Sequence, residues 1–295
     1  MPAYFTGCHG GGNKLAKQKL KQLSKHVRYL PADHETDRPV LGAVIGNDYT
    51  LIVDAGNSPA HAELFLNELK EIKAPESRLL VLTHWHWDHI FGMKKMNLPA
   101  IAHTKTKKYI EKLKGLQWTD EALDERVRTG VEIEFCAEMI KKEFGERRNE
   151  IEIVSPVITF ENSLAIDLGG VRVRLQHVGG DHADDSIVVF VEKDKVLFLG
   201  DCYTQNMYAK KWNYTAPVFL KLLDELEHFQ AAVYLHSHCD PATQAEFFQE
   251  LFEMRITTKA AVENKGNREA IHSAMKEGLG RELNDDDLEL ASYLG

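Results

Sequence analysis

Four potential metal ligands lie within six residues of this 295-residue chain, in the stretch Thr83–His89 (Thr-His-Trp-His-Trp-Asp-His). An apolar run directly before the stretch predicts a buried strand. His84 and His86, two apart in an extended chain, point to the same side, and Asp88 and His89 follow beyond the bend. Imidazoles and a carboxylate are ligands for zinc, or for iron or manganese in an oxygen-rich site. The stretch therefore predicts part of a site for two metal ions.

Composition limits the classes of function. The chain has 36 Lys and Arg against 45 Asp and Glu, a net charge of -9, which argues against a nucleic-acid surface. Neither a signal peptide nor a membrane span is evident. Its four cysteines are scattered without a CxxC pair, which favours free thiols and a reducing compartment. They are Cys8, Cys136, Cys202 and Cys239. We expect a cytoplasmic protein with a small-molecule substrate and no nucleic-acid or membrane partner.

Strand patterns alternate with helical ones along the chain. Strands are predicted at 27–31, 41–45, 49–53, 79–82, 99–103, 151–154, 157–160, 164–166, 171–177, 186–191, 195–199 and 231–235. Helices are predicted at 13–26, 60–69, 90–96, 217–229 and 242–254, with further helical segments in the tail. Two halves of strands and helices predict an α/β protein in which two sheets pack face to face with helices outside.

The same patterns divide the chain into parts. Residues 1–26 are predicted to be a leader with a basic helix, 27–254 a catalytic domain, and 255–295 a C-terminal helical tail. A charged block at about 105–150 separates the two strand-rich halves and predicts a helical insertion. A homo-oligomer would form through this insertion.

The remaining candidate ligands follow predicted strands, where side chains of different strands meet at one sheet edge. His182 follows the strand 171–177, although His177 competes with it. Asp201 follows the strand 195–199. His236 and His238 both follow the strand 231–235, and either one can face the metals.

This ordered set resembles the signature of the metallo-β-lactamase-fold superfamily, over residues from about 27 to about 254. The resemblance implies a four-layer αβ/βα sandwich of two mixed β-sheets, with the metals at one edge. It implies one metal held by His84, His86 and His182, a second held by Asp88, His89 and His238, Asp201 bridging the two, and Asp54 bracing the ligand loop. The family pattern favours His182 over His177, because a glycine-rich turn precedes it and Ser186 follows four positions later. It also favours His238 over His236.

The resemblance implies a dinuclear metal-dependent hydrolase, in which a metal-bridging hydroxide attacks the carbonyl of a small ester, thioester or lactone. Asp201 replaces the cysteine of some β-lactamases and looks closer to thioesterases and lactonases of the glyoxalase II type. Zinc is the expected metal, with iron or manganese as alternatives. Asp88, Asp201 and Tyr203 are expected to take part in catalysis, with Tyr208 as an alternative oxyanion donor. A mononuclear-iron persulfide dioxygenase is the alternative function.

Overall fold

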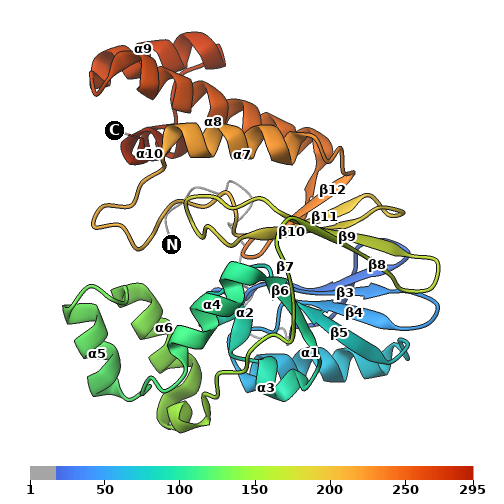
Figure 1. Cartoon of the computed structure of the whole chain (residues 1–295). Helices are drawn as coiled ribbons and strands as arrows, with labels where there is room; N and C mark the ends of the chain where they lie inside the picture. The colour runs from blue at the N-terminus through green and yellow to red at the C-terminus, as the bar shows by residue number, and fades with distance from the viewer. Residues whose placement is uncertain (1–17, 295) are drawn as a thin grey trace.

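The computed structural model describes residues 18–294, so the predicted leader and the start of the basic helix lie outside the described residues. Two mixed β-sheets pack face to face with helices on both outer sides, as Figure 1 shows. The molecule is therefore the predicted four-layer αβ/βα sandwich.

The first sheet has the order β1-β2-β3-β4-β5-β6-β7. Its strands are β1 (Lys21–Gln22), β2 (Val27–Leu30), β3 (Leu41–Ile45), β4 (Thr50–Val53), β5 (Ser77–Val81), β6 (Ala100–His103) and β7 (Ile158–Phe160). Pairing is antiparallel from β1 to β4 and parallel from β4 to β7. The parallel part brings the carboxyl ends of β4 and β5 to the same edge.

The second sheet has the order β13-β12-β11-β10-β9-β8. Its strands are β8 (Ser163–Asp167), β9 (Arg172–His177), β10 (Ile187–Val191), β11 (Val196–Gly200), β12 (Val233–His236) and β13 (Ala242–Thr243). Only β11 and β12 pair in parallel, so these two also end at one edge.

Strand β4 shows why the apolar runs are continuous. Leu51 and Val53 face the core between the sheets, whereas Ile52 faces the core under the outer helices. A strand with both faces buried is apolar at every position rather than at alternate ones.

Helices cover both sheets. They are α1 (Pro59–Glu71), α2 (Trp87–Ile90), α3 (Met93–Met96), α4 (Thr104–Leu113), α5 (Asp120–Arg128), α6 (Glu134–Phe144), the 3-10 helix η1 (Gly145–Glu150), α7 (Ala216–Glu227), α8 (Gln244–Asn264), α9 (Arg268–Leu279) and α10 (Asp285–Tyr293). Helices α1 and α3 lie against the first sheet, α7 and α8 lie against the second, and α9 and α10 pack on α8. Ser58 caps α1 by accepting a hydrogen bond from the backbone of His61, and Pro59 opens the first turn.

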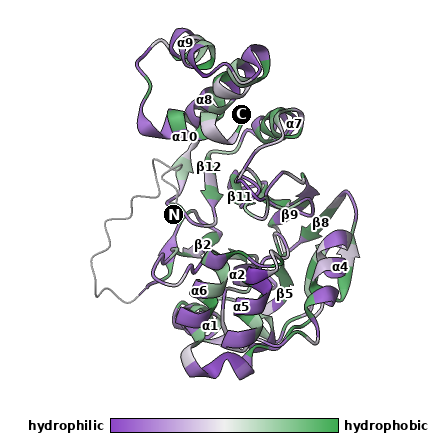
Figure 2. Cartoon of the chain, turned by 90° about the vertical axis from the view of Figure 1, so that its left-hand side faces the viewer, coloured by the Kyte–Doolittle hydropathy of each residue, from purple (hydrophilic) through white to green (hydrophobic). Residues whose placement is uncertain are grey.

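Helices α4 to η1 fill the region between β6 and β7, where the sequence predicted a helical insertion. Apolar residues of this layer, among them Ile110, Leu123 and Ile140, join the core under the first sheet. Helix α5 is largely hydrophilic on its outside (Figure 2). The division of the chain into parts stays a prediction, and α8 runs through the boundary predicted at residue 254.

The basic helix predicted at 13–26 is wrong for the described residues 18–26. Lys21 and Gln22 instead form β1, which pairs with β2. Leu20 and Leu23 contact different cores, which an extended segment allows. Helical spacing of a few apolar residues could not reveal that a neighbouring strand offered an edge.

Two other predictions need correction. No strand forms at 151–154; Ile151, Ile153 and Val154 pack as irregular chain against the core under the first sheet. The single helix predicted at 90–96 is two short helices, α2 and α3, joined at Phe91 and Gly92. A Cβ on Gly92 would meet the carbonyl oxygen of Ala55 at 2.0 Å, so the close approach requires glycine.

The expectation of free thiols holds for Cys136 and Cys202, which are free and buried. It is wrong for Cys239, which is disulfide-bonded. No helix among residues 18–294 is long and apolar enough to cross a membrane.

Candidate metal centre

The stretch 83–89 turns from β5 into α2 as the sequence predicted. His86 has an extended backbone at the N-terminal end of α2, and the next residues turn into the helix. This bend brings Asp88 and His89 to a different side from His84, and all four side chains are buried. One short segment therefore presents ligand side chains in two directions.

The structure gathers the seven predicted ligands into two groups at one edge of the sandwich. One group is His84, His86 and His182, and the other is Asp88, His89, Asp201 and His238. Within each group, one potential ligand atom from each residue lies within 4.8 Å of the others. These clusters are compatible with a dinuclear metal site.

Asp201 lies between the two groups. Its Oδ2 is 3.8 Å from Nε2 of His84 and 3.6 Å from Nε2 of His182. The same oxygen is 3.3 Å from Nε2 of His89 and 3.4 Å from Nε2 of His238. One carboxylate oxygen thus faces both groups, which is the position that a bridging ligand needs.

Gly200 makes this position accessible. Its φ of 57° is unfavourable for other residues, and a Cβ there would lie 2.8 Å from the Cβ of Thr83. The missing side chain lets the end of β11 approach the ligand loop, so that Asp201 can reach the histidines.

The first group has the chemistry of a metal site. Nε2 of His84, His86 and His182 is buried without a hydrogen-bond partner among the described residues. Burial lowers the pKa of all three imidazoles, so they are neutral and present lone pairs. Leaving such groups unsatisfied costs about 1–3 kcal/mol each, which a bound cation would offset.

The second group carries excess negative charge. Burial alone would lower the pKa of His89 and His238. Neighbouring carboxylates instead raise both pKa values well above the usual range, with Asp88 contributing most at His89 and Asp201 most at His238. The pocket thus favours positive charge. A divalent cation would supply that charge and would displace the protons of both imidazoles.

Asp54 orients the ligand loop, as predicted for a bracing residue. Its Oδ1 accepts a hydrogen bond from the backbone N–H of Thr83 at 2.7 Å, and its Oδ2 accepts one from the hydroxyl at 2.8 Å. Oδ2 also lies 2.9 Å from Nδ1 of His89. The contact fixes Nε2 of His89 toward the second group.

Asp37 plays a similar geometric part that the sequence did not reveal. It is buried, and its Oδ1 lies 3.5 Å from Nδ1 of His238. Burial raises the pKa of Asp37 to about 7. Its backbone φ of 58° is unusual for aspartate. The Asp-Arg-Pro sequence indicated only a turn, and no local pattern connects it to a histidine about 200 residues later.

The structure separates the competing histidines. His177 points away from the site, with Nε2 2.9 Å from the carbonyl oxygen of Asp184 and its ring stacked on His103 at 3.9 Å. His236 uses both ring nitrogens in the protein: Nδ1 accepts from the backbone N–H of His238, and Nε2 lies 3.1 Å from the hydroxyl of Thr204. His182 and His238 are therefore the histidines that face the ligand groups.

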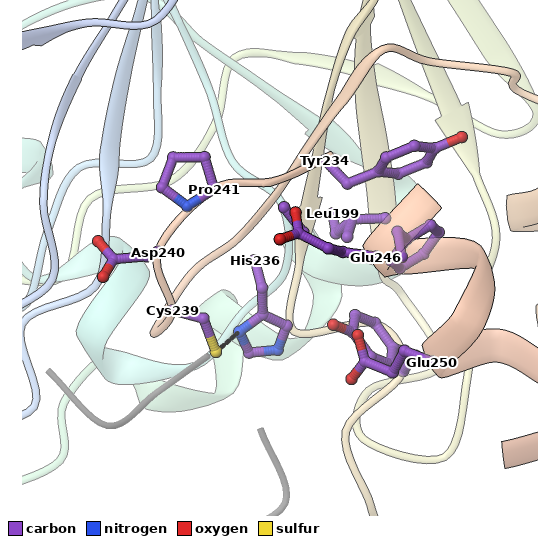
Figure 3. A pocket seen from close by; sticks show the side chains of 11 residues that line it. Leu199, Tyr234, His236, Cys239, Asp240, Pro241, Glu246 and Glu250 are labelled. Carbon is purple, nitrogen blue, oxygen red and sulfur yellow. Dashed lines mark hydrogen bonds between the residues drawn. The ribbon is translucent and has the colours of Figure 1, made fainter. Parts of the chain in front are cut away.

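Tyr203 and Tyr208 lie on different sides of the site. The ring of Tyr203 contacts His236 at 5.2 Å and helps line a cavity of about 360 Å³ with Glu250. Figure 3 shows His236 in this cavity between Cys239 and Glu250. The ring of Tyr208 lies 5.4 Å from His86. Oxyanion donation stays a prediction for both tyrosines.

An aromatic wall flanks the first ligand group. Trp85, which separates the first two histidines, lies 5.5 Å from the ring of Tyr109 and 6.0 Å from that of Tyr208. The hydroxyl of Tyr208 donates to Glu132 at 2.9 Å. The wall thus joins the ligand loop, the helical insertion and the loop after Asp201. Tyr109 and Glu132 were not predicted, because nothing in their local sequence indicates this convergence.

With this fold and these ligand groups, the chain belongs to the metallo-beta-lactamase superfamily, whose family profile matches residues 36–202. It is 25% identical over 231 residues to the linear primary-alkylsulfatase of Pseudomonas sp. (strain ATCC 19151), covering 69% of this chain and 42% of that protein. It is 23% identical over 175 residues to human acyl-coenzyme A thioesterase MBLAC2, covering 56% of this chain and 58% of that protein. The chain thus spans about half the length of these relatives.

Solved structures share the fold. A metallo-beta-lactamase from Pontibacter korlensis superposes with a TM-score of 0.56 at 19% identity, covering 80% of this chain and 97% of that one. A double mutant of the sec-alkyl sulfatase PisA1 superposes with a TM-score of 0.63 at 15% identity, covering 94% and 49%. These similarities support the architecture and leave the substrate to the residues of the site.

Proposed function

We propose that this protein is a dinuclear, zinc-dependent hydrolase of a small ester, thioester or lactone. The observation that carries the proposal is the pair of ligand groups that share Asp201. Seven ligands exceed what one tetrahedral zinc uses. His84, His86 and His182 would hold one ion, Asp88, His89 and His238 the other, and Asp201 would contact both.

Two bound metal ions would supply an activated water and would polarise the scissile carbonyl. Asp54 would orient the ring of His89 toward the metal ions, and Asp37 would orient the ring of His238. Asp88 has its Oδ2 3.0 Å from Nε2 of His89 and 3.3 Å from Nε2 of His238. With the ions bound, this carboxylate would accept the proton of the attacking water and return it to the departing oxygen or sulfur.

The wall of Trp85, Tyr109 and Tyr208 supports a substrate with an apolar acyl chain. All three rings are partly exposed beside the first ligand group, where they can cover a chain while its carbonyl reaches the metals. The human relative is named for acyl-coenzyme A thioesters and the bacterial one for alkyl sulfates. We therefore place thioesters with apolar acyl chains first among the substrates.

The proposal also includes a cytoplasmic location, no nucleic-acid or membrane partner, and a homo-oligomer formed through the helical insertion. The acidic net charge supports the absence of a nucleic-acid partner. Size-exclusion chromatography with light scattering tests the oligomer.

Metal content and oxygen dependence test the reaction class. Protein purified without added metal should contain two metal ions per chain, and zinc-loaded protein should hydrolyse members of a thioester, lactone and ester panel without oxygen. Elemental analysis and anaerobic assays measure both. One iron per chain, with oxygen consumed on glutathione persulfide, would instead establish the dioxygenase alternative.

Replacing Trp85 tests the acyl-binding wall. Trp85→Ala should raise KM for an octanoyl thioester about tenfold and leave acetyl thioester hydrolysis nearly unchanged, because about two methylenes lose their apolar cover at about 0.8 kcal/mol each. Tyr109→Phe keeps the ring and serves as the matched control. An equal effect of Trp85→Ala on both substrates would contradict chain binding at this wall.

A further inference from the structure

A second cavity, of about 300 Å³, lies between the C-terminal helices and the loop that follows Asp201. Lys211 enters it from the loop, and Arg268 and His272 enter it from α9. Ile271 and Leu288 contribute apolar surface from α9 and α10. The loop after Asp201 thus meets two C-terminal helices around one space. Both helices lie on the side of the second sheet that faces away from α5 and α6 (Figure 1).

The polar lining of this cavity is basic. No carboxylate side chain lines it, and neither Lys211 nor Arg268 has an ion pair or side-chain hydrogen bond within residues 18–294. The other lysine or arginine of α9, Lys276, is paired with Glu282. In a chain with net charge -9, two unpaired cations that share a cavity repel each other and attract an anion.

The side chains of Lys211 and Arg268 are exposed, but the backbone that carries Lys211 is held by its neighbours. The ring of Trp212 lies 6.3 Å from that of Tyr293 on α10, and the backbone N–H of Tyr214 donates to the carbonyl oxygen of Tyr293 at 2.9 Å. Arg268 opens the twelve-residue helix α9, whose N-terminal end adds a positive partial charge. The cations therefore stand on anchored backbone and not on a free segment.

We propose that this cavity binds an organic phosphate or sulfate monoester with a small apolar body. Lys211 and Arg268 would pair with the tetrahedral anion, and His272 and the hydroxyl of Ser292 would complete its hydrogen bonds. Ile271 and Leu288 would cover the apolar part. The volume accommodates the anion with a ring or short chain, and this binding is separate from the reaction at the metal centre.

Nuclear magnetic resonance of α9 and α10 amides tests the site with phenyl phosphate and phenyl sulfate. We expect saturable shifts at Ile271 and Ala291 in the metal-loaded protein, and an affinity at least about tenfold weaker in the double variant Lys211→Gln, Arg268→Gln, because two charge-assisted contacts are lost. Lys259→Gln removes an exposed lysine of α8 elsewhere and should leave the affinity unchanged.

Comparison of phenyl phosphate with benzyl alcohol separates binding through the anion from binding through the apolar ring. Benzyl alcohol, which lacks the anion, should cause no shifts in α9 and α10. Equal affinity of the double variant and the unchanged protein, shifts confined to residues 83–89, or equal binding of benzyl alcohol and phenyl phosphate would overturn the proposal. Because the readout is binding at α9 and α10, the result does not depend on hydrolysis at the metal centre.

Discussion

Asp201→Ala should lower the metal content below two ions per chain and reduce turnover at least about a thousandfold. The carboxylate oxygen that faces both ligand groups is removed, and with it the stabilisation that a shared pair of ions supplies. A loss of about 4 kcal/mol of transition-state stabilisation corresponds to about a thousandfold in rate. Elemental analysis and kcat/KM on the best thioester measure the two effects.

Asp240→Ala is the matched control, because Asp240 is an exposed carboxylate two residues beyond His238. It should retain both ions and full activity. Thermal unfolding of both variants shows whether Asp201→Ala still folds. A folded Asp201→Ala protein with full activity would sink the dinuclear proposal.

His238→Ala should lose the second metal ion, whereas His236→Ala should keep both and lose activity about 10–100-fold. Nε2 of His238 lies 3.3–3.4 Å from carboxylate oxygens of Asp88 and Asp201. Both ring nitrogens of His236 instead form hydrogen bonds, one with the hydroxyl of Thr204 and one with the backbone N–H of His238. Loss of His236 should therefore disturb the ligand His238 only indirectly. Metal counts on the two variants measure the difference.

His228→Ala, on the exposed end of α7, controls for the loss of an imidazole. It should change neither metal content nor activity. The opposite order of metal counts in the first two variants would show that His236 is the ligand.

The sequence predicted the fold and the ligand cluster because both depend on short patterns. His84 to His89 follow a strand within six residues, and the apolar strands and helical spacings between 27 and 254 determine the order of elements. His182 and Asp201 were candidates because they follow strands, and the family pattern then favoured His182 over His177. The structure then separated His238 from His236 by hydrogen bonds that no spacing encodes.

What the sequence could not reveal depends on contacts between distant segments. Asp37 reaches His238 across the sandwich, and Tyr109 and Glu132 meet the site only because the insertion folds over it. The extended β1 replaced an expected helix because an open edge of β2 was available. In each case a residue or strand elsewhere in the chain determines the local structure or contact, and local propensity carries no information about that partner.

Each ligand group combines residues from both halves of the sandwich. In the first group, His84 and His86 follow a strand of the first sheet and His182 follows a strand of the second. In the second group, Asp88 belongs to the first half, and Asp201 and His238 belong to the second. Neither half can hold an ion in full coordination by itself. If the proposed ions bind, metal occupancy and docking of the two sheets would be linked equilibria, and free metal at about 100 times its dissociation constant would add about 2.7 kcal/mol to the stability of the docked state. Scarcity of metal would then shorten the lifetime of the folded protein as well as lower its turnover, because chains without metal would separate more often between the two sheets.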